Sequence, residues 1–236
     1  CASYYLLPSV HVLVPGMDLP LAMKSATPRR RRLIGWLGVP LRLASADTAE
    51  DLSLPLPPRE LASSLAADKA LAVRAGGEAG TILAFDTVVV HADRVLGKPV
   101  DRDDARRMLD ELSDGAHEVV TGVAILPPGV RTPDTFAVVT PVVMRPLPAA
   151  AIESWIAGDE VLGCAGAYNI ERHLASVEDD QCFNNVAGMP LCHVYRELAS
   201  GRAGAVPAGL TPPVTACDVA LGRRCLLGPK VCGSAD

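Results

Sequence analysis

Apolar and polar positions follow two different periods along the chain. Apolar runs of strand length occur at residues 21–23, 41–44, 82–90, 117–126 and 136–144. Segments with apolar residues at helical spacing lie between or after them, at residues 28–37, 58–75, 101–112, 149–156 and 188–198. Because strands and helices alternate, the pattern predicts an α/β fold in which helices flank a mixed, twisted sheet.

Two local signals refine this prediction. Thr27 followed by Pro28 is typical of a helix start, with the hydroxyl as N-cap and proline at the first helical position. Pro141 removes one hydrogen-bond donor from the run at 136–144. That strand is therefore expected at a sheet edge or at a bulge.

The regular pattern divides the chain into three parts. Residues 1–18 are expected to form an N-terminal appendage with one short β-like patch at 10–14. We interpret the start at Cys1 as a truncation or start-site artefact, and the alternatives are a processed precursor and a lipid-attached N-terminus. Residues 19–200 carry all the other expected elements and form one domain. Residues 201–236, rich in Gly, Pro and Ala, are expected to be a linker and tail, whose cysteines lack the close pairs of a structural zinc site.

Composition narrows the class of protein. The 236 residues are 49% hydrophobic, which is enough for a sizeable core. A net charge of -5 disfavours nucleic acid as a partner, because Arg29–Arg32 is the one concentrated basic cluster. Apolar runs are too short for a membrane span. Seven scattered cysteines favour free thiols in a reducing compartment, so we expect a cytoplasmic protein.

Asp86 is the most unusual residue of the apolar run at 82–90. A carboxylate in a strand buried on both faces costs several kcal/mol unless a cation compensates it. Asp86 is therefore a candidate site residue. The alternative is a structural aspartate that caps a turn between two shorter strands.

Lys69 is a second unusual charge. It follows Leu61 and Leu65 on the apolar stripe of the expected helix, so its ammonium is predicted to point inward or along the sheet edge. The alternative is a lysine that reaches solvent from the margin of a neighbouring buried face. Lys98 adds a further cation in a loop, between Gly97 and Pro99.

The turn before the first expected helix combines hydroxyls and guanidinium groups. The residues concerned are Ser25, Thr27, Arg29 and Arg30. Free amides at a helix start, together with arginine, are suited to phosphate oxygens. The alternative is a capped helix whose arginines are solvated.

Read in order, these features resemble the Maf family of nucleotide pyrophosphatases over about residues 21–200. The matching motifs are Ser25-Ala26-Thr27-Pro28-Arg29-Arg30, the acidic Glu50, Leu65-Ala66-Ala67-Asp68-Lys69-Ala70, Ala84-Phe85-Asp86-Thr87, Leu96-Gly97-Lys98-Pro99, His117-Glu118-Val119-Val120-Thr121-Gly122-Val123, Ala165-Gly166-Ala167-Tyr168 and Asn185-Val186-Ala187-Gly188-Met189-Pro190-Leu191. Several motifs in the correct order are more specific than any one of them.

The chain departs from the family pattern near the expected substrate pocket. Cys164 replaces a lysine, Asn169 and Glu171 replace a glycine and a glutamine, and Phe85 replaces a small residue. These changes bear on substrate identity more than on reaction type. The tyrosine-bearing segment resembles the branch that acts on dTTP and UTP.

The resemblance implies a Maf/ITPase-like fold with a cleft between two lobes, homodimerisation, and hydrolysis of nucleoside triphosphates to monophosphate and pyrophosphate. It implies catalytic roles for Asp86, Lys69, Lys98 and Glu50, and Mg²⁺ or Mn²⁺ held by Glu50 and Asp86. The implied substrate-binding residues are Ser25, Thr27, Arg29, Arg30, Thr87 and Glu171. Two alternatives stay open: a nucleotide-binding regulator of cell division without turnover, and a house-cleaning pyrophosphatase for ITP or XTP.

Overall fold

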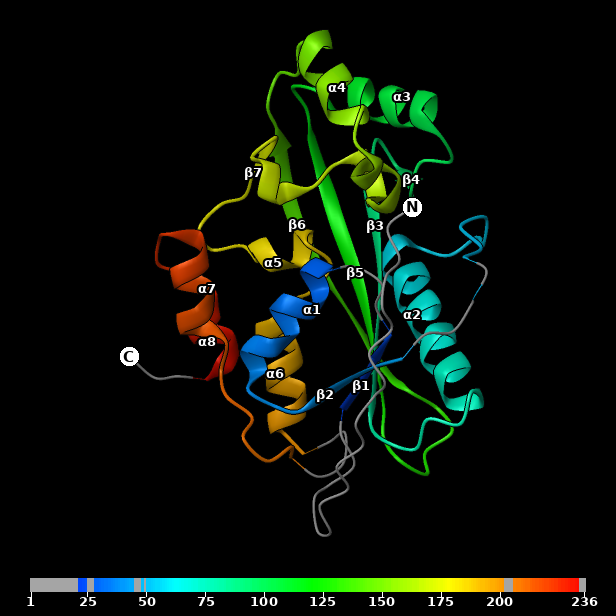
Figure 1. Ribbon diagram of the computed structural model, residues 1–236, viewed down its shortest axis with the longest axis vertical. Coiled ribbons are helices and arrows are strands. Elements are labelled where there is room, and N and C mark those ends of the chain that lie inside the picture. The colour runs from blue at the N-terminus through cyan, green and yellow to red at the C-terminus, as the bar shows by residue number, and fades with distance from the viewer. Residues whose placement is uncertain (1–20, 25–27, 45–47, 49, 202–205, 234–236) are drawn as a thin grey trace, which may run out of the picture.

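The structure is a computed structural model that describes residues 21–24, 28–44, 48, 50–201 and 206–233. Its described strands form one sheet in the order β2-β1-β3-β5-β6-β7, and β4 pairs with β3 (Figure 1). The strands are β1 (Leu21–Lys24), β2 (Leu41–Ala44), β3 (Ile82–His91), β4 (Arg94–Leu96), β5 (Ala116–Leu126), β6 (Asp134–Met144) and β7 (Ala175–Ser176). β1 runs parallel to β2 and β3, and the other pairs are antiparallel, so the prediction of a mixed sheet is confirmed.

Helices cover both faces of this sheet. The helices are α1 (Pro28–Ile34), α2 (Pro58–Ala75), α3 (Arg102–Leu112), α4 (Ala149–Ile156), α5 (Phe183–Val186), α6 (Leu191–Ala199), α7 (Val214–Leu221) and α8 (Gly228–Cys232). Helix α2 lies on one face, and α1 and α6 lie on the other (Figure 1). Short 3-10 turns are η1 (Gly35–Leu37), η2 (Asp159–Gly163), η3 (Ala165–Ala167) and η4 (Ile170–Arg172). In the described ranges, no helix combines the length and the apolar character that crossing a membrane requires.

Strand β3 separates two hydrophobic clusters because its side chains point alternately to the two faces. Ile82 and Ala84 pack into the smaller cluster with the alanines of α2. Leu83 and Phe85 belong to the larger cluster, which α1, α3 and α6 share. Asp86 therefore points towards α2, whereas Thr87 points to the opposite face.

Helix α2 approaches the sheet unusually closely at Gly122. A Cβ atom placed on Gly122 would lie 2.1 Å from the Ala62 carbonyl oxygen and 2.5 Å from the Ser63 nitrogen. Gly122 is also the register partner of Asp86. The missing side chain of Gly122 thus sets the separation between the helix that carries Lys69 and the strand that carries Asp86.

Several element boundaries differ from the predictions. Asp101 is the N-cap of α3, not its first residue, and its carboxylate accepts a hydrogen bond from the Asp104 amide at 2.8 Å. The helix expected at 188–198 begins at Leu191, because Gly188 has a φ of +75°. The prediction for Pro141 is confirmed, since β6 pairs there with β5 alone among the described strands.

The segment after Gly201 contains structure that the sequence did not predict. It forms α7 and α8, and α8 packs against α6 (Figure 1). The expectation of a tail without elements is therefore wrong for residues 206–233. The expected appendage at 1–18, with its β-like patch, lies outside the described residues.

Candidate active site

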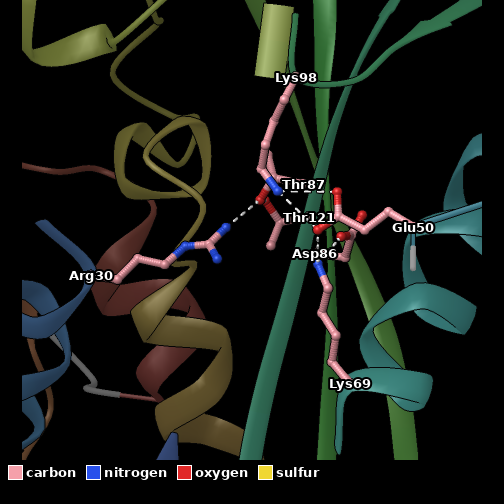
Figure 2. A network of polar contacts seen from close by, with 7 residues as sticks. All are labelled: Arg30, Glu50, Lys69, Asp86, Thr87, Lys98 and Thr121. Atoms are coloured by element: carbon pink, nitrogen blue, oxygen red, sulfur yellow. Dashed lines mark hydrogen bonds and ion pairs between the residues drawn. The ribbon is translucent and has the colours of Figure 1, made fainter. Parts of the chain in front are cut away.

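Four charged side chains form an alternating chain on the α2 side of β3 (Figure 2). The Lys69 ammonium forms a hydrogen-bonded ion pair with Asp86 and donates to Glu50 Oε1 at 2.8 Å. The Lys98 ammonium donates to both Glu50 oxygens, at 2.8 and 3.0 Å. The order is Asp86, Lys69, Glu50, Lys98, so Lys98 joins the cluster through Glu50.

The local fold explains why the first pair is buried. Leu61, Leu65 and Lys69 all lie on the buried side of α2, and β3 runs unbroken through Asp86. Lys69 is 7% exposed and Asp86 is 4% exposed. Burying either charge alone would cost several kcal/mol, so each requires the other. This arrangement excludes both a solvated Lys69 and a turn at Asp86.

Glu50 is ionised at neutral pH. Burial raises the pKa of this carboxyl, but hydrogen bonds from Lys69 and Lys98, together with their positive charges, outweigh it and lower the pKa to about 2. The negative charges of the two carboxylates equal the positive charges of the two ammoniums, so the cluster has no net charge. A polyanionic ligand would therefore compete with the carboxylates for these two cations.

A polar network occupies the opposite face of β3. Arg30 donates from Nη2 to Thr87 Oγ1 at 3.0 Å, and Thr87 shares a 3.1 Å hydrogen bond with Thr121 (Figure 2). Burial lowers the pKa of the Arg30 guanidinium, and the Asp86 charge opposes that effect. Arg30 thus places a half-buried cation across the strand from Lys69.

The turn before α6 packs against this network. A Cβ atom on Gly188 would lie 2.4 Å from Arg30 Nη2 and 2.9 Å from Thr87 Oγ1. Thr121 donates to the Asn185 carbonyl at 3.1 Å, and the Asn185 amide donates to the Val119 and Val138 carbonyls. Gly188 is therefore required both for its positive φ and for the space it leaves to Arg30.

One edge of β3 is unpaired beside the charged groups. β1 pairs with β3 at Ile82 and Leu83, and β4 pairs with it from Val89 to His91. In the part of the chain that the structure describes, residues 84–88 pair only with β5. Arg30 lies on α1, which follows β1, and Lys98 follows β4. These two cations therefore lie on either side of residues 84–88.

The other residues singled out in the sequence occupy different places. The Nε atom of Arg29 is buried without a partner among the described residues. The positive charge of Arg29 opposes burial, which raises the pKa of the Cys164 thiol. Glu171 forms an ion pair with Arg32 on α1. Ser25 and Thr27, including the expected N-cap, lie outside the described residues. The roles assigned to these residues stay predictions.

Sequence reasoning gave no role to Thr121, Asn185 or Gly188. Each lies in a motif that was noted only as part of the family pattern. Thr121 and Asn185 are fully buried polar residues, and such groups require partners. Thr121 interrupts an apolar stretch of β5. This interruption was the sequence feature that could have identified it as a buried polar residue of the site.

His117 ties β5 to the segment that contains Ala165-Gly166-Ala167-Tyr168. Its Nε2 atom lies 2.8 Å from the Tyr168 hydroxyl, and its Nδ1 atom is buried without a partner among the described residues. Burial, together with the nearby charge of His91, lowers the pKa of His117 to about 4. The folded protein therefore holds this imidazole neutral down to about pH 4.

This pKa predicts a loss of stability in mild acid. An unfolded histidine binds a proton below about pH 6.5, while folded His117 stays neutral until about pH 4. The free energy of unfolding should fall between these pH values, by up to about 3 kcal/mol.

His117→Gln should reduce this dependence of the unfolding free energy on pH, measured by urea titration at pH 7, 6, 5 and 4. His193, whose pKa is also lowered to about 4, and carboxyls with lowered pKa values, Glu50 among them, account for the slope that remains. The exposed His173→Gln serves as control, and an unchanged slope in His117→Gln would contradict the assignment.

Comparison with known proteins agrees with this arrangement of motifs. The family model described as Maf-like protein matches residues 20–201. The chain belongs to the Maf family. Both halves of the site, Lys69 with Asp86 and Arg30 with Thr87, lie within the matched residues, whereas α7 and α8 lie beyond them.

Individual Maf relatives are similar over nearly their whole length. A dTTP/UTP pyrophosphatase from Syntrophomonas wolfei is 41% identical over 180 residues, which is 75% of this chain and 95% of the relative. Proteins of the same name from Geobacter sulfurreducens and Salinibacter ruber are 39% and 36% identical, over 75% and 81% of this chain and 94% and 96% of the relatives.

Proposed function

We propose that this Maf protein hydrolyses dTTP and UTP to the nucleoside monophosphate and pyrophosphate. The observation that carries the proposal is the buried Asp86, held by Lys69 next to Glu50. A carboxylate buried inside the protein is expensive unless a cation pairs with it, and such groups concentrate at functional sites. The names of the relatives support pyrimidine triphosphates as the substrate class.

The surrounding cations suit a triphosphate. Such a substrate carries about four negative charges at neutral pH, and its hydrolysis develops further charge on the departing pyrophosphate. Lys98 is 49% exposed at its side chain, so it can turn from Glu50 towards phosphate oxygens. Arg30 offers a second cation across the open stretch of β3. These two groups would bind the phosphate chain and stabilise the leaving group.

We further propose that Glu50 and Asp86 hold Mg²⁺ or Mn²⁺. Both carboxylates contact the same Lys69 ammonium, so their oxygens lie close together. No group of three or more His, Cys, Asp or Glu side chains suited to a metal was found among the described residues. Two carboxylates nevertheless fit Mg²⁺, which usually completes its shell with waters and substrate phosphates. The ion would polarise the phosphate that is attacked.

The chain's own residues would handle the proton. Asp86 would accept a proton from the attacking water, and Lys69 would hold that carboxylate in one orientation. Thr87 and Thr121 would keep Arg30 directed at the phosphates. Homodimerisation stays a prediction of the family resemblance, and a cytoplasmic location stays a prediction of the cysteine pattern.

The proposal is tested by measuring pyrophosphate release from dTTP, UTP, dATP, ITP, XTP and 7-methyl-GTP, with Mg²⁺ and Mn²⁺ in turn. We expect kcat/KM for dTTP and UTP to exceed the other values by at least about tenfold. EDTA should remove the activity, and added metal should restore it. A preference for ITP or XTP would favour the house-cleaning alternative. Nucleotide binding without pyrophosphate release would favour the regulator.

A further inference from the structure

The part of the chain beyond the family match contacts the Maf domain at two places. Residues 206–233, called here the C-terminal extension, lie outside the matched residues 20–201. They place α7 and α8 on the same side of the sheet as α1 and α6 (Figure 1). The first contact is made by the segment before α7, and the second by α7 and the loop that follows it. Both contacts fall on segments next to Arg30, which the proposed function assigns to the phosphate chain.

The first contact lies at the end of the helical segment that carries Arg30. The turn η1 continues α1 without a break and ends at Gly38, which has a φ of +72°. The Thr211 amide donates to the Leu37 carbonyl at 2.9 Å. A Cβ atom on Gly38 would lie 2.8 Å from the Gly209 carbonyl oxygen and 2.8 Å from Thr211 Oγ1. The extension thus packs against the end of this segment with no room for a side chain between them.

The second contact lies at α5. Asn184 is 7% exposed and donates from Nδ2 to Cys217 Sγ at 3.0 Å. Cys217 is the one buried residue of α7. In the loop after α7, Arg223 donates to the Val177 carbonyl at 3.0 Å and forms an ion pair with Asp179. The extension therefore holds both α5 and the chain that leads into it.

The turn after α5 connects this second contact to Arg30. The Asn184 carbonyl accepts a hydrogen bond from the Met189 amide at 2.9 Å, and the Asn185 carbonyl accepts one from the Gly188 amide at 2.8 Å. These two bonds fix the turn in which Gly188 lies against Arg30, where a Cβ atom would be 2.4 Å from Nη2. A shift of α5 would therefore move this turn relative to the guanidinium group.

We infer that the C-terminal extension positions Arg30 for the phosphate chain of the substrate. The inference rests on the proposed function, because that function places Arg30 at the phosphates. The extension binds the end of the segment that carries Arg30, and it also binds the helix before the turn that limits the movement of its guanidinium. Asn184 and Cys217 are positioning residues, since they act on the substrate only through this turn.

The alternative is an extension that merely covers apolar surface. Such a cover would pack through apolar side chains, but α7 buries one residue, and that residue accepts a hydrogen bond from a buried amide. The two roles predict different results. Loss of a cover lowers stability and leaves the affinity for phosphate groups unchanged, whereas loss of a positioning contact lowers that affinity in a folded protein.

Binding of tripolyphosphate to the full-length chain, measured by calorimetry with Mg²⁺, tests the inference. This probe presents the phosphate chain without base or sugar, and its binding needs no turnover. Cys217→Ala removes the acceptor of the Asn184 hydrogen bond and should raise the Kd about fivefold. Cys217→Ser supplies a hydroxyl that can accept the same bond, so it should keep the Kd within about twofold.

Cys225→Ala is the matched control. It removes the same atoms from the extension, but the Cys225 thiol accepts a hydrogen bond from the Gly228 amide, which belongs to the extension itself. The Kd of this variant should stay within about twofold of the original value. Melting curves establish that each variant is folded before its affinity is measured.

A double-mutant cycle tests whether the effect passes through Arg30. Arg30→Gln removes the cation and should itself weaken tripolyphosphate binding. Adding Cys217→Ala to Arg30→Gln should then change the Kd by less than about twofold, because no cation remains to be positioned. Asn184→Ala removes the same hydrogen bond from the other side, so it completes the cycle if Cys217→Ala does not fold.

Three outcomes would overturn the inference: an original protein that does not bind tripolyphosphate, a folded Cys217→Ala or Asn184→Ala variant with the original Kd, or an equal loss of affinity with and without Arg30. Pyrophosphate release from dTTP is measured on the same samples. An original protein that binds tripolyphosphate and releases no pyrophosphate would contradict the proposed hydrolysis alone, and the Kd values would still decide the role of the extension.

Discussion

Asp86→Asn should lower pyrophosphate release from dTTP by at least about a hundredfold. Asparagine keeps the size of the side chain and one oxygen acceptor, but it removes the charge that pairs with Lys69 and the basicity needed to accept a proton. Because Glu50 still bonds Lys69, the ammonium keeps one anionic partner and the variant should fold. The measurement is kcat and KM with dTTP and metal, on protein whose melting curve remains cooperative.

The matched control is Asp103→Asn. Asp103 is an exposed carboxylate that pairs with Arg106 on α3, so its replacement removes the same charge at the protein surface. Activity of this variant should stay within about twofold, as expected for a surface substitution. A folded Asp86→Asn protein that releases pyrophosphate at a near-normal rate would remove Asp86 from the reaction.

Gly122→Ala should destabilise the protein and reduce activity together. The added Cβ meets backbone atoms of Ala62 and Ser63, which cannot move without displacing α2. Overpacking of this kind typically lowers the free energy of unfolding by about 1–3 kcal/mol. We expect about 3 kcal/mol here, because the added Cβ meets both the carbonyl and the amide atoms of one peptide group. Displacement of α2 also carries Lys69 away from Asp86. Urea denaturation gives the stability, and the pyrophosphate assay gives the activity.

Gly163→Ala is the control for this prediction. No atom lies within 4 Å of a Cβ built at Gly163, and its φ is not positive. Its stability should therefore change by less than about 0.5 kcal/mol. If Gly122→Ala had the stability and the pyrophosphatase activity of the original protein, the close approach of α2 to β5 would not set the position of Lys69.

The residues explain why the sequence predicted some parts of the site and not others. Asp86 and Lys69 break local apolar patterns, so the chain itself marks them as unusual, and α2 and β3 fold where those patterns place them. The contact between Lys98 and Glu50 joins two loops 48 residues apart, which no periodicity encodes. Gly188 matters through its space beside Arg30, and that space exists only after folding.

The C-terminal helices were missed for a different reason. α7 begins after two prolines and consists largely of small residues, so it carries no wide apolar stripe. Only one of its residues, Cys217, is buried. Its helical state depends on contacts with neighbouring helices, including α8, and not on a pattern of its own.

Neighbouring side chains of one strand serve separate compartments in this protein. Asp86 belongs to the layer beneath α2, and Thr87 belongs to the layer beneath α1 and α5, with the sheet as a partition between them. Because the Asp86 charge acts on the Arg30 guanidinium across the strand, substitutions in the Arg30 layer and in the Lys69 layer should not combine additively in their effects on folding. The sheet therefore separates the packing of the two layers but not their charges.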